Sequence, residues 1–133
     1  MGEIFTWPIR IYYEDTDASG VAYHARYLNW FERARSEWLR AKGRSHQRMA
    51  AEFGSVFTVV SIDIRYRQPA RLDDALLATV TVAQQGHASL VFEQKLLRPE
   101  SPENPLAIAQ VKVACVDASS FKPRAWPVGW LEP

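Results

Sequence analysis

The amino-acid sequence predicts an α+β fold in which an antiparallel sheet is folded around one long helix. Hydrophobic residues recur at steps of three and four between residues 25 and 42, and at every second position in the segments after residue 55. The chain has 133 residues, of which 47% are hydrophobic and 23% are charged, as is typical of one globular domain with a real core. We therefore expect residues 1–133 to form a single domain.

The N-terminal segment is expected to form a strand followed by a turn. Over residues 9–14, Ile9, Ile11 and Tyr13 alternate with Arg10, Tyr12 and Glu14. This period of two is that of a half-buried strand. Residues 15–20 contain two aspartates, a serine and a glycine, and this composition is typical of a turn.

Two helices are predicted after the turn. The long one covers Ala25–Lys42, and a shorter one covers Gln47–Phe53, with Ser45 near its start and Gly54 beyond its end. The apolar face of the long helix holds Tyr27, Phe31, Ala34, Trp38 and Ala41.

Four strands are predicted after the helices, over residues 56–67, 76–86, 90–96 and 106–116. Hairpin-like spacings join them, so we expect an antiparallel sheet. On the first of these strands, one face is expected to hold Val56, Thr58, Val60, Ile62, Ile64 and Tyr66, and the other Ser61, Asp63, Arg65 and Arg67.

Charge and composition argue against several classes of function. Sixteen basic and fifteen acidic residues give a net charge of +1, whereas nucleic-acid-binding domains are usually strongly basic. The single cysteine excludes an intramolecular disulfide, and the histidines and cysteine show no metal-ligand spacing. Residues 1–10 lack the features of a signal peptide, and no apolar run reaches the roughly 20 residues that cross a bilayer, so a cytoplasmic protein is expected.

The chemistry that remains lies in residues 12–24, between the first strand and the long helix. The first N–H groups of a helix have no partner within the helix, so they can stabilise a carbonyl oxygen that becomes negative. A carboxylate from the preceding loop could attack that carbonyl or activate a water. The alternative is that Asp15 and Asp17 only cap a turn.

The run from Tyr12 to His24, YYEDTDASGVAYH, and the helical segments Glu32–Arg35 and Glu37–Arg40 resemble the hotdog-fold acyl-CoA thioesterases. The match is best to the Tol-Pal-associated branch of the 4-hydroxybenzoyl-CoA thioesterase family, and it covers essentially the whole chain. This resemblance implies a hotdog fold, with its sheet wrapped around the helix, and hydrolysis of an acyl-CoA thioester to free acid and coenzyme A without a metal or cofactor. It also implies a homodimer with sheets joined edge to edge, doubled into a homotetramer.

The resemblance assigns site residues one by one. Asp17 matches the catalytic carboxylate, acting as a nucleophile or as a general base, and Tyr13 matches a tyrosine that lines the site. His24 matches the histidine of this branch, and its backbone N–H falls where the thioester oxygen is bound. Ser19 and Ala22 stand where relatives often have glycine and valine, so the shape of the acyl pocket is left open.

Several assignments have alternatives. Asp15 is expected to cap the turn rather than to act as a second catalytic acid. Arg65, Arg67 and Arg71 could bind the phosphates of coenzyme A, since arginine forks suit phosphate, or could be ordinary surface residues. Cys115, in an apolar strand, is expected to be a buried thiol rather than a nucleophile.

Two classes of function remain open at this point. The chain could be the hydrolase, or it could be a non-catalytic module that binds acyl-CoA or acyl carrier protein. Asp17 favours the enzyme, because a binding module needs no carboxylate beside a carbonyl that it leaves intact. A hotdog dehydratase is disfavoured, since the seven-residue step from Asp17 to His24 follows the thioesterase motif. The acyl group itself is not predicted.

Overall fold

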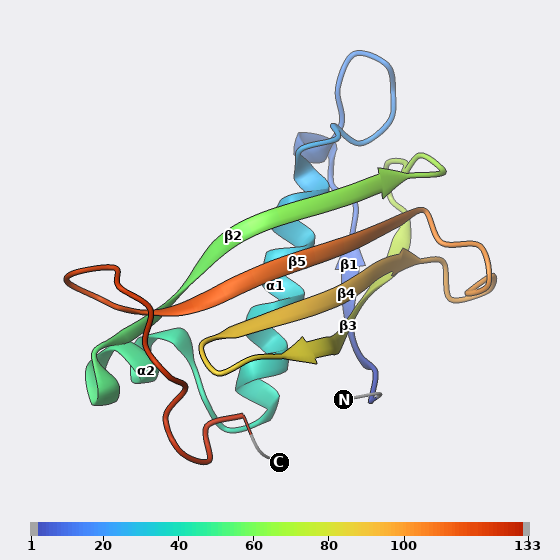
Figure 1. Cartoon of the computed structure of the whole chain (residues 1–133). Coiled ribbons are helices and arrows are strands. Elements are labelled where there is room, and N and C mark those ends of the chain that lie inside the picture. The colour runs from blue at the N-terminus through green and yellow to red at the C-terminus, as the bar shows by residue number, and fades with distance from the viewer. Residues whose placement is uncertain (1–2, 132–133) are drawn as a thin grey trace.

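A computed structural model describes residues 3–131 and shows one five-stranded sheet with two helices. The strand order is β1-β3-β4-β5-β2, and all neighbouring strands are antiparallel. Figure 1 shows the arrangement. The elements are β1 (Phe5–Arg10), the single-turn helix η1 (Tyr13–Asp15), α1 (Arg26–Ala41), α2 (His46–Phe53), β2 (Ser55–Tyr66), β3 (Ala75–Gln85), β4 (Ser89–Leu97) and β5 (Ala107–Asp117).

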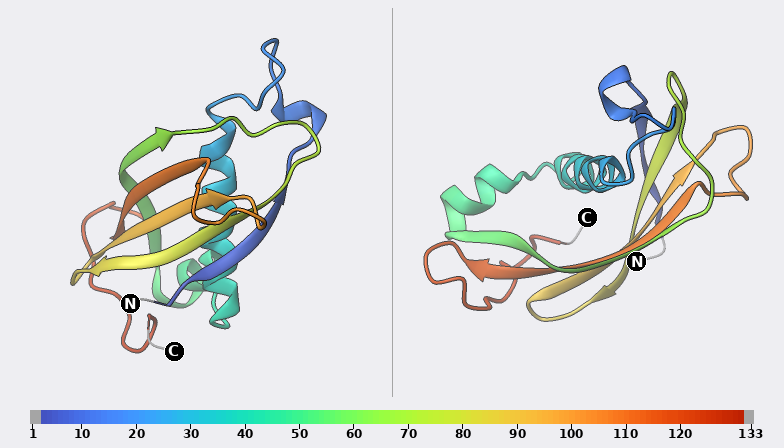
Figure 2. Two further views of the ribbon diagram at one scale, coloured as in Figure 1. Left: turned by 90° about the vertical axis from the view of Figure 1, so that its right-hand side faces the viewer. Right: turned by 90° about the horizontal axis from the view of Figure 1, so that it is seen from above.

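The long helix α1 lies against the concave face of the curved sheet (Figure 2). Its buried face holds four of the five residues that the helical period places there, and only Ala41, the last residue of the helix, is exposed. Trp30 and Leu39 widen this face, and both are almost fully buried. The predicted fold class is therefore confirmed. Neither α1 nor α2 is long and apolar enough to cross a membrane.

The strand pairing differs from the prediction at one connection. The β3–β4 and β4–β5 hairpins form as expected. β2 and β3, however, are not neighbours: β2 pairs with β5 at one edge of the sheet, and β3 pairs with β1 and β4. Residues 67–74 therefore cross from one edge strand towards the opposite half of the sheet. The prediction of a hairpin between β2 and β3 was wrong, because a short spacing alone does not determine which strands pair.

The first strand ends earlier than its alternation predicts. β1 begins at Phe5 and ends at Arg10, after which the Ile11 N–H donates to the Asp74 carbonyl at 3.0 Å. The chain then turns into η1, where Tyr13 is 82% exposed. The prediction of strand over residues 11–14 was thus wrong, since the buried side chain of Ile11 belongs to a loop.

The faces of β2 also differ from the prediction, because the strand contains a β-bulge. Val59 lies opposite Val113 on β5, and Ser61 lies opposite the next residue, Lys112, so Val60 is an extra residue. The alternation changes phase there. Side chains that lie opposite each other share a face, so Phe57 and Val59 face α1 before the bulge, and Ile62, Ile64 and Tyr66 face it afterwards. The prediction that Val56, Thr58 and Val60 share one face with Ile62, Ile64 and Tyr66 was therefore wrong.

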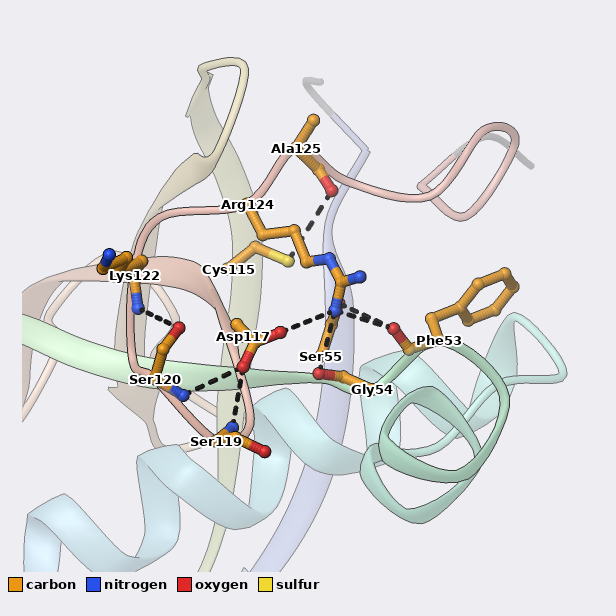
Figure 3. A network of polar contacts seen from close by, with 10 residues as sticks. All are labelled: Phe53, Gly54, Ser55, Cys115, Asp117, Ser119, Ser120, Lys122, Arg124 and Ala125. Carbon is orange, nitrogen blue, oxygen red and sulfur yellow. Dashed lines mark hydrogen bonds and ion pairs between the residues drawn. The ribbon is translucent and has the colours of Figure 1, made fainter.

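The C-terminal segment packs over the ends of β2 and α2 (Figure 3). The Arg124 guanidinium donates to the carbonyl oxygens of Phe53 and Gly54 at 3.0 and 3.2 Å, and to the Asp117 carboxylate at 3.1 Å. It thereby joins the segment after β5 to the end of α2. Gly54, which ends α2 with a φ of +63°, has the left-handed conformation that favours glycine.

Candidate functional site

A cavity of about 320 Å³ lies where the chain enters α1. Its walls come from three places: the loop before the helix, the first turn of the helix, and the end of β2 with the loop that follows. The lining residues are Val21, Ala22, His24, Tyr27, Tyr66, Arg67, Gln68 and Pro69. The structure therefore forms a cavity at the segment that the sequence singles out, next to the loop that protrudes at the top of Figure 1.

Main-chain hydrogen bonds hold the loop before α1 in place. The Tyr23 N–H donates to the Asp15 carbonyl at 2.7 Å, and the Ala22 N–H donates to the Ala70 carbonyl at 2.8 Å. The Asp15 side chain is buried and accepts the Tyr12 N–H at 2.8 Å. These contacts fit the turn-capping role expected for Asp15.

Asp17 lies on the protruding loop and is exposed. Its carboxylate accepts the Ser19 N–H at 2.8 Å and the Ser19 hydroxyl. These two hydrogen bonds, the hydroxyl first, lower the pKa of Asp17 below its ordinary value, and the charge of nearby His24 lowers it further. Asp17 is therefore a carboxylate at neutral pH, and it does not line the cavity itself.

His24 lines the cavity just before α1 begins. In residues 3–131, neither its backbone N–H nor that of Ala25 donates to a protein acceptor. Ala25 is the N-cap and makes no side-chain capping bond, so this end of the helix presents free donors and the positive end of the helix dipole. The His24 ring lies between Tyr23 and Tyr66, at centroid distances of 4.4 and 6.3 Å.

Two tyrosines of the site were not identified from the sequence. The Tyr27 hydroxyl accepts the Ala70 N–H at 3.0 Å, and its burial raises the pKa of Tyr27. The Tyr66 hydroxyl donates to the His24 carbonyl at 2.8 Å, and the Tyr66 ring packs edge-on against Tyr27 at 5.0 Å. Their positions in the sequence could have indicated them, because Tyr27 is the first residue of the apolar face of the helix and Tyr66 is the last of the apolar face of the strand.

The other predicted site residues are not gathered in one place. Arg67 lines the cavity, and Arg71 lies beside it on the exposed loop that forms a bridge with Val21. Arg65 alternates with Tyr66 and so lies on the opposite face of the sheet. Tyr13 is exposed and outside the cavity lining. The structure brings His24 and Arg67 together; the roles of Arg65, Arg71 and Tyr13 stay predictions.

A second cavity, of about 260 Å³, lies further along α1, between this helix, α2 and β2. Four of its lining residues are aliphatic or aromatic, namely Val56, Phe57, Val59 and Val113. The other three, Glu32, Arg35 and His46, are ionisable. Burial lowers the pKa of His46 and also that of Arg35. Glu32 is two turns along the helix from the first cavity, or about 12 Å from His24 at 1.5 Å per residue.

Among residues 3–131, no group of three or more His, Cys, Asp or Glu side chains is placed to hold a metal ion. Cys115 is buried, and burial raises the pKa of its thiol, as expected for a cysteine that is not a nucleophile.

Comparison with known proteins identifies relatives over nearly the whole chain. The family model described as the thioesterase superfamily matches residues 19–103. The acyl-CoA thioesterase YbgC of Haemophilus influenzae is 46% identical over 92% of this chain and 88% of its own length. The acyl-CoA thioester hydrolase YbgC of Escherichia coli O6:H1 is 45% identical over 93% of this chain and 90% of its own length.

The fold is also found among solved structures. A probable thioesterase from Bartonella henselae superposes with a TM-score of 0.87 and 34% identity, over 94% of this chain and all of that one. Together with the sheet and helix described above, this likeness confirms the hotdog fold that the resemblance implies. The resemblance to the Tol-Pal-associated branch is confirmed by the YbgC relatives.

Proposed function

This chain belongs to the thioesterase superfamily and, like its YbgC relatives, is an acyl-CoA thioesterase, and we propose that Asp17 and the start of α1 carry out the hydrolysis of the thioester. The products are the free acid and coenzyme A. In this proposal the thioester carbonyl lies at the cavity beside His24, where the free backbone N–H groups stabilise its oxygen as it becomes negative.

The Asp17 carboxylate has two possible roles at this carbonyl. As a nucleophile it adds to the carbonyl carbon, and the C–S bond breaks to give a mixed anhydride and the coenzyme A thiolate, which takes up a proton; water then cleaves the anhydride. As a general base it takes a proton from the water that attacks. Both routes need an ionised carboxylate, and the exposed Asp17 side chain is ionised at neutral pH.

The observation that supports this proposal is the pair of free N–H groups at the start of α1, those of His24, which lines the cavity, and of Ala25. The Asp17 carboxylate lies on the loop that leads to this point, and the charge of His24 is among the causes that lower its pKa. In the proposal, this base or nucleophile and the oxyanion site act on one thioester carbonyl. The proposed mechanism uses no metal or cofactor. Sulfur gives the thioester carbonyl little resonance stabilisation, so its carbon is already electrophilic.

The test is the variant Asp17→Asn, assayed by thiol release from a series of acyl-CoA substrates. Asparagine keeps the size of the side chain and can still accept the Ser19 hydrogen bonds, but it has no charge. We expect turnover to fall by about 100-fold or more, with acyl-CoA binding kept. The matched control is Glu14→Gln, an exposed carboxylate on the same loop, which should keep full turnover.

Three outcomes would contradict the proposal. Near wild-type turnover in Asp17→Asn would exclude a catalytic carboxylate there. Loss of both folding and binding would mark Asp17 as structural. Binding without turnover by the unmodified protein would identify the non-catalytic binding module instead.

The second cavity is proposed to take the acyl group. It lies along α1 from the thioester position, between the helix and β2, and its lining is mostly apolar. The coenzyme A part of the bound substrate would then extend from the thioester in the other direction, towards Arg67 and Arg71. Acyl carrier protein is an alternative carrier of the same thioester, and assays on both carriers separate them.

A homodimer joined through β2, doubled into a tetramer, is proposed for the assembly. β2 stands at the end of the strand order, so one of its edges has no partner within residues 3–131. Val59, Val60 and Ile62 on this strand are 47%, 56% and 39% exposed. An exposed apolar edge strand is normally paired or covered. Light scattering at micromolar concentration should show at least a dimer; a monomer would contradict the assembly. A cytoplasmic location stays a prediction.

A further inference from the structure

The carbonyl of His24 is held from outside the helix. His24 precedes the N-cap Ala25, and the carbonyl of the N-cap is the first that accepts a helical N–H. The Leu28 N–H accordingly donates to the Ala25 carbonyl, at 3.2 Å. The His24 oxygen accepts the Tyr66 hydroxyl, at 2.8 Å. The side chain that orients this peptide group therefore comes from β2 and not from the helix itself.

Within residues 3–131, no other group donates to the His24 carbonyl. The N-cap residue is Ala25, which has no polar side chain, and it makes no capping bond. The preceding carbonyl, that of Tyr23, accepts the Arg26 N–H at 2.9 Å, so the turn fixes only the first of the two peptide groups. The second, between His24 and Ala25, depends on Tyr66.

The Tyr66 hydroxyl is itself well positioned. Its ring packs edge-on against Tyr27, and the Tyr27 hydroxyl is anchored to the main chain at Ala70. Burial raises the pKa of Tyr66, as does the neighbouring Tyr27, so the hydroxyl keeps its proton at neutral pH. The His24 carbonyl and the Ala25 N–H belong to one planar peptide group, so holding the carbonyl also fixes the direction of the Ala25 N–H.

We propose that Tyr66 is a positioning residue: by holding the His24 carbonyl, it fixes the peptide group between His24 and Ala25 and so keeps the helix start in the conformation that leaves its N–H groups free for the reacting oxygen. This inference rests on the proposed function. In this role Tyr66, the last residue of β2, does not contact the reacting atoms. It supports transition-state stabilisation only by holding the main chain at the start of α1.

The test is Tyr66→Phe, which keeps the ring packing and removes only the hydroxyl. We expect kcat to fall by about 10-fold with KM changed less than about 2-fold, because an oxyanion donor acts in the transition state and not in the bound ground state. The control is Tyr12→Phe, which removes an exposed hydroxyl outside the cavity. A purely structural role would lower the melting temperature without this split between kcat and KM.

A second readout does not depend on turnover. In protein labelled with ¹³C at the carbonyl of histidine, the His24 resonance should shift in Tyr66→Phe and stay unchanged in Tyr12→Phe. An unchanged His24 resonance, or unchanged kcat in folded Tyr66→Phe, overturns the inference. If the unmodified protein hydrolyses no thioester, the proposed function fails, and the inference fails with it even where the resonance shifts.

Discussion

Gln94 joins the long helix to the middle of the sheet, and its replacement should be costly. This side chain is completely buried on β4. Its amide oxygen accepts the Arg35 guanidinium at 2.9 Å, and its amide nitrogen donates to the carbonyls of Phe31 and Thr79 at 3.0 and 3.3 Å. Two residues of α1 and one of β3 therefore meet at a single amide group.

Gln94→Leu keeps the volume of the side chain and removes all three bonds. Each amide bond to a carbonyl contributes about 1 kcal/mol net, and leaving the half-buried Arg35 without its acceptor costs about 1–3 kcal/mol. The additional apolar burial of leucine offsets roughly 1 kcal/mol of this. We expect the free energy of unfolding to fall by about 2–4 kcal/mol, which lowers the melting temperature by roughly 10 °C for a chain of this size.

The assay is thermal unfolding at one fixed protein concentration, because assembly makes stability depend on concentration. Gln110→Leu is the matched control, since Gln110 is a glutamine on the adjacent strand β5 whose side chain is exposed. It should change the free energy of unfolding by less than about 0.5 kcal/mol. Equal stability of the two variants would refute the reasoning. The double variant that also carries Arg35→Leu should regain part of the loss, because no buried donor is then left unpaired.

Two further predictions concern the site. His24→Ala should lower turnover on several acyl-CoA substrates, and full turnover would leave only the backbone N–H of His24 with a role. Ser19→Ala removes the hydrogen bond that lowers the pKa of Asp17 most, so this pKa should rise towards its ordinary value. Because the carboxylate is the active form, activity should then be lost at a higher pH on acidification; an acid limb of the kcat/KM profile that does not move would contradict this.

Much of the fold is readable from the sequence because the helix and the hairpins are locally determined. The buried face of α1 repeats with the helical period, and Ser45 caps α2 by accepting the Arg48 N–H at 3.1 Å. The strand order is not local. Which strand lies beside β2 depends on the packing of the whole sheet over α1. Residues 67–74 precede β3 and residues 86–88 precede β4, and only the second connection forms a hairpin.

The site is readable only where a motif marks it. Asp17 and His24 lie in the loop whose sequence resembles the thioesterases; His24 lines the cavity just before α1, and Asp17 lies on the exposed loop that leads to it. Tyr66 is 42 residues away from His24 along the chain, so only the tertiary fold brings its hydroxyl to the His24 carbonyl. The alternation places Arg65 and Arg67 on one face, but β2 ends at Tyr66, and the pattern alone does not say that only Arg67 reaches the cavity.

The bulge at Val60 decides which side chains of β2 face the helix. Val59 faces α1, so uninterrupted alternation would place Arg65 on the helix side and Tyr66 on the outer face. One extra residue reverses this order and brings Tyr66 to the His24 carbonyl. The sequence around the bulge conceals it, because residues 56–60 are apolar or β-branched at odd and even positions alike. A period of two therefore fits both faces there, and only the pairing of β2 with β5 shows where the phase changes.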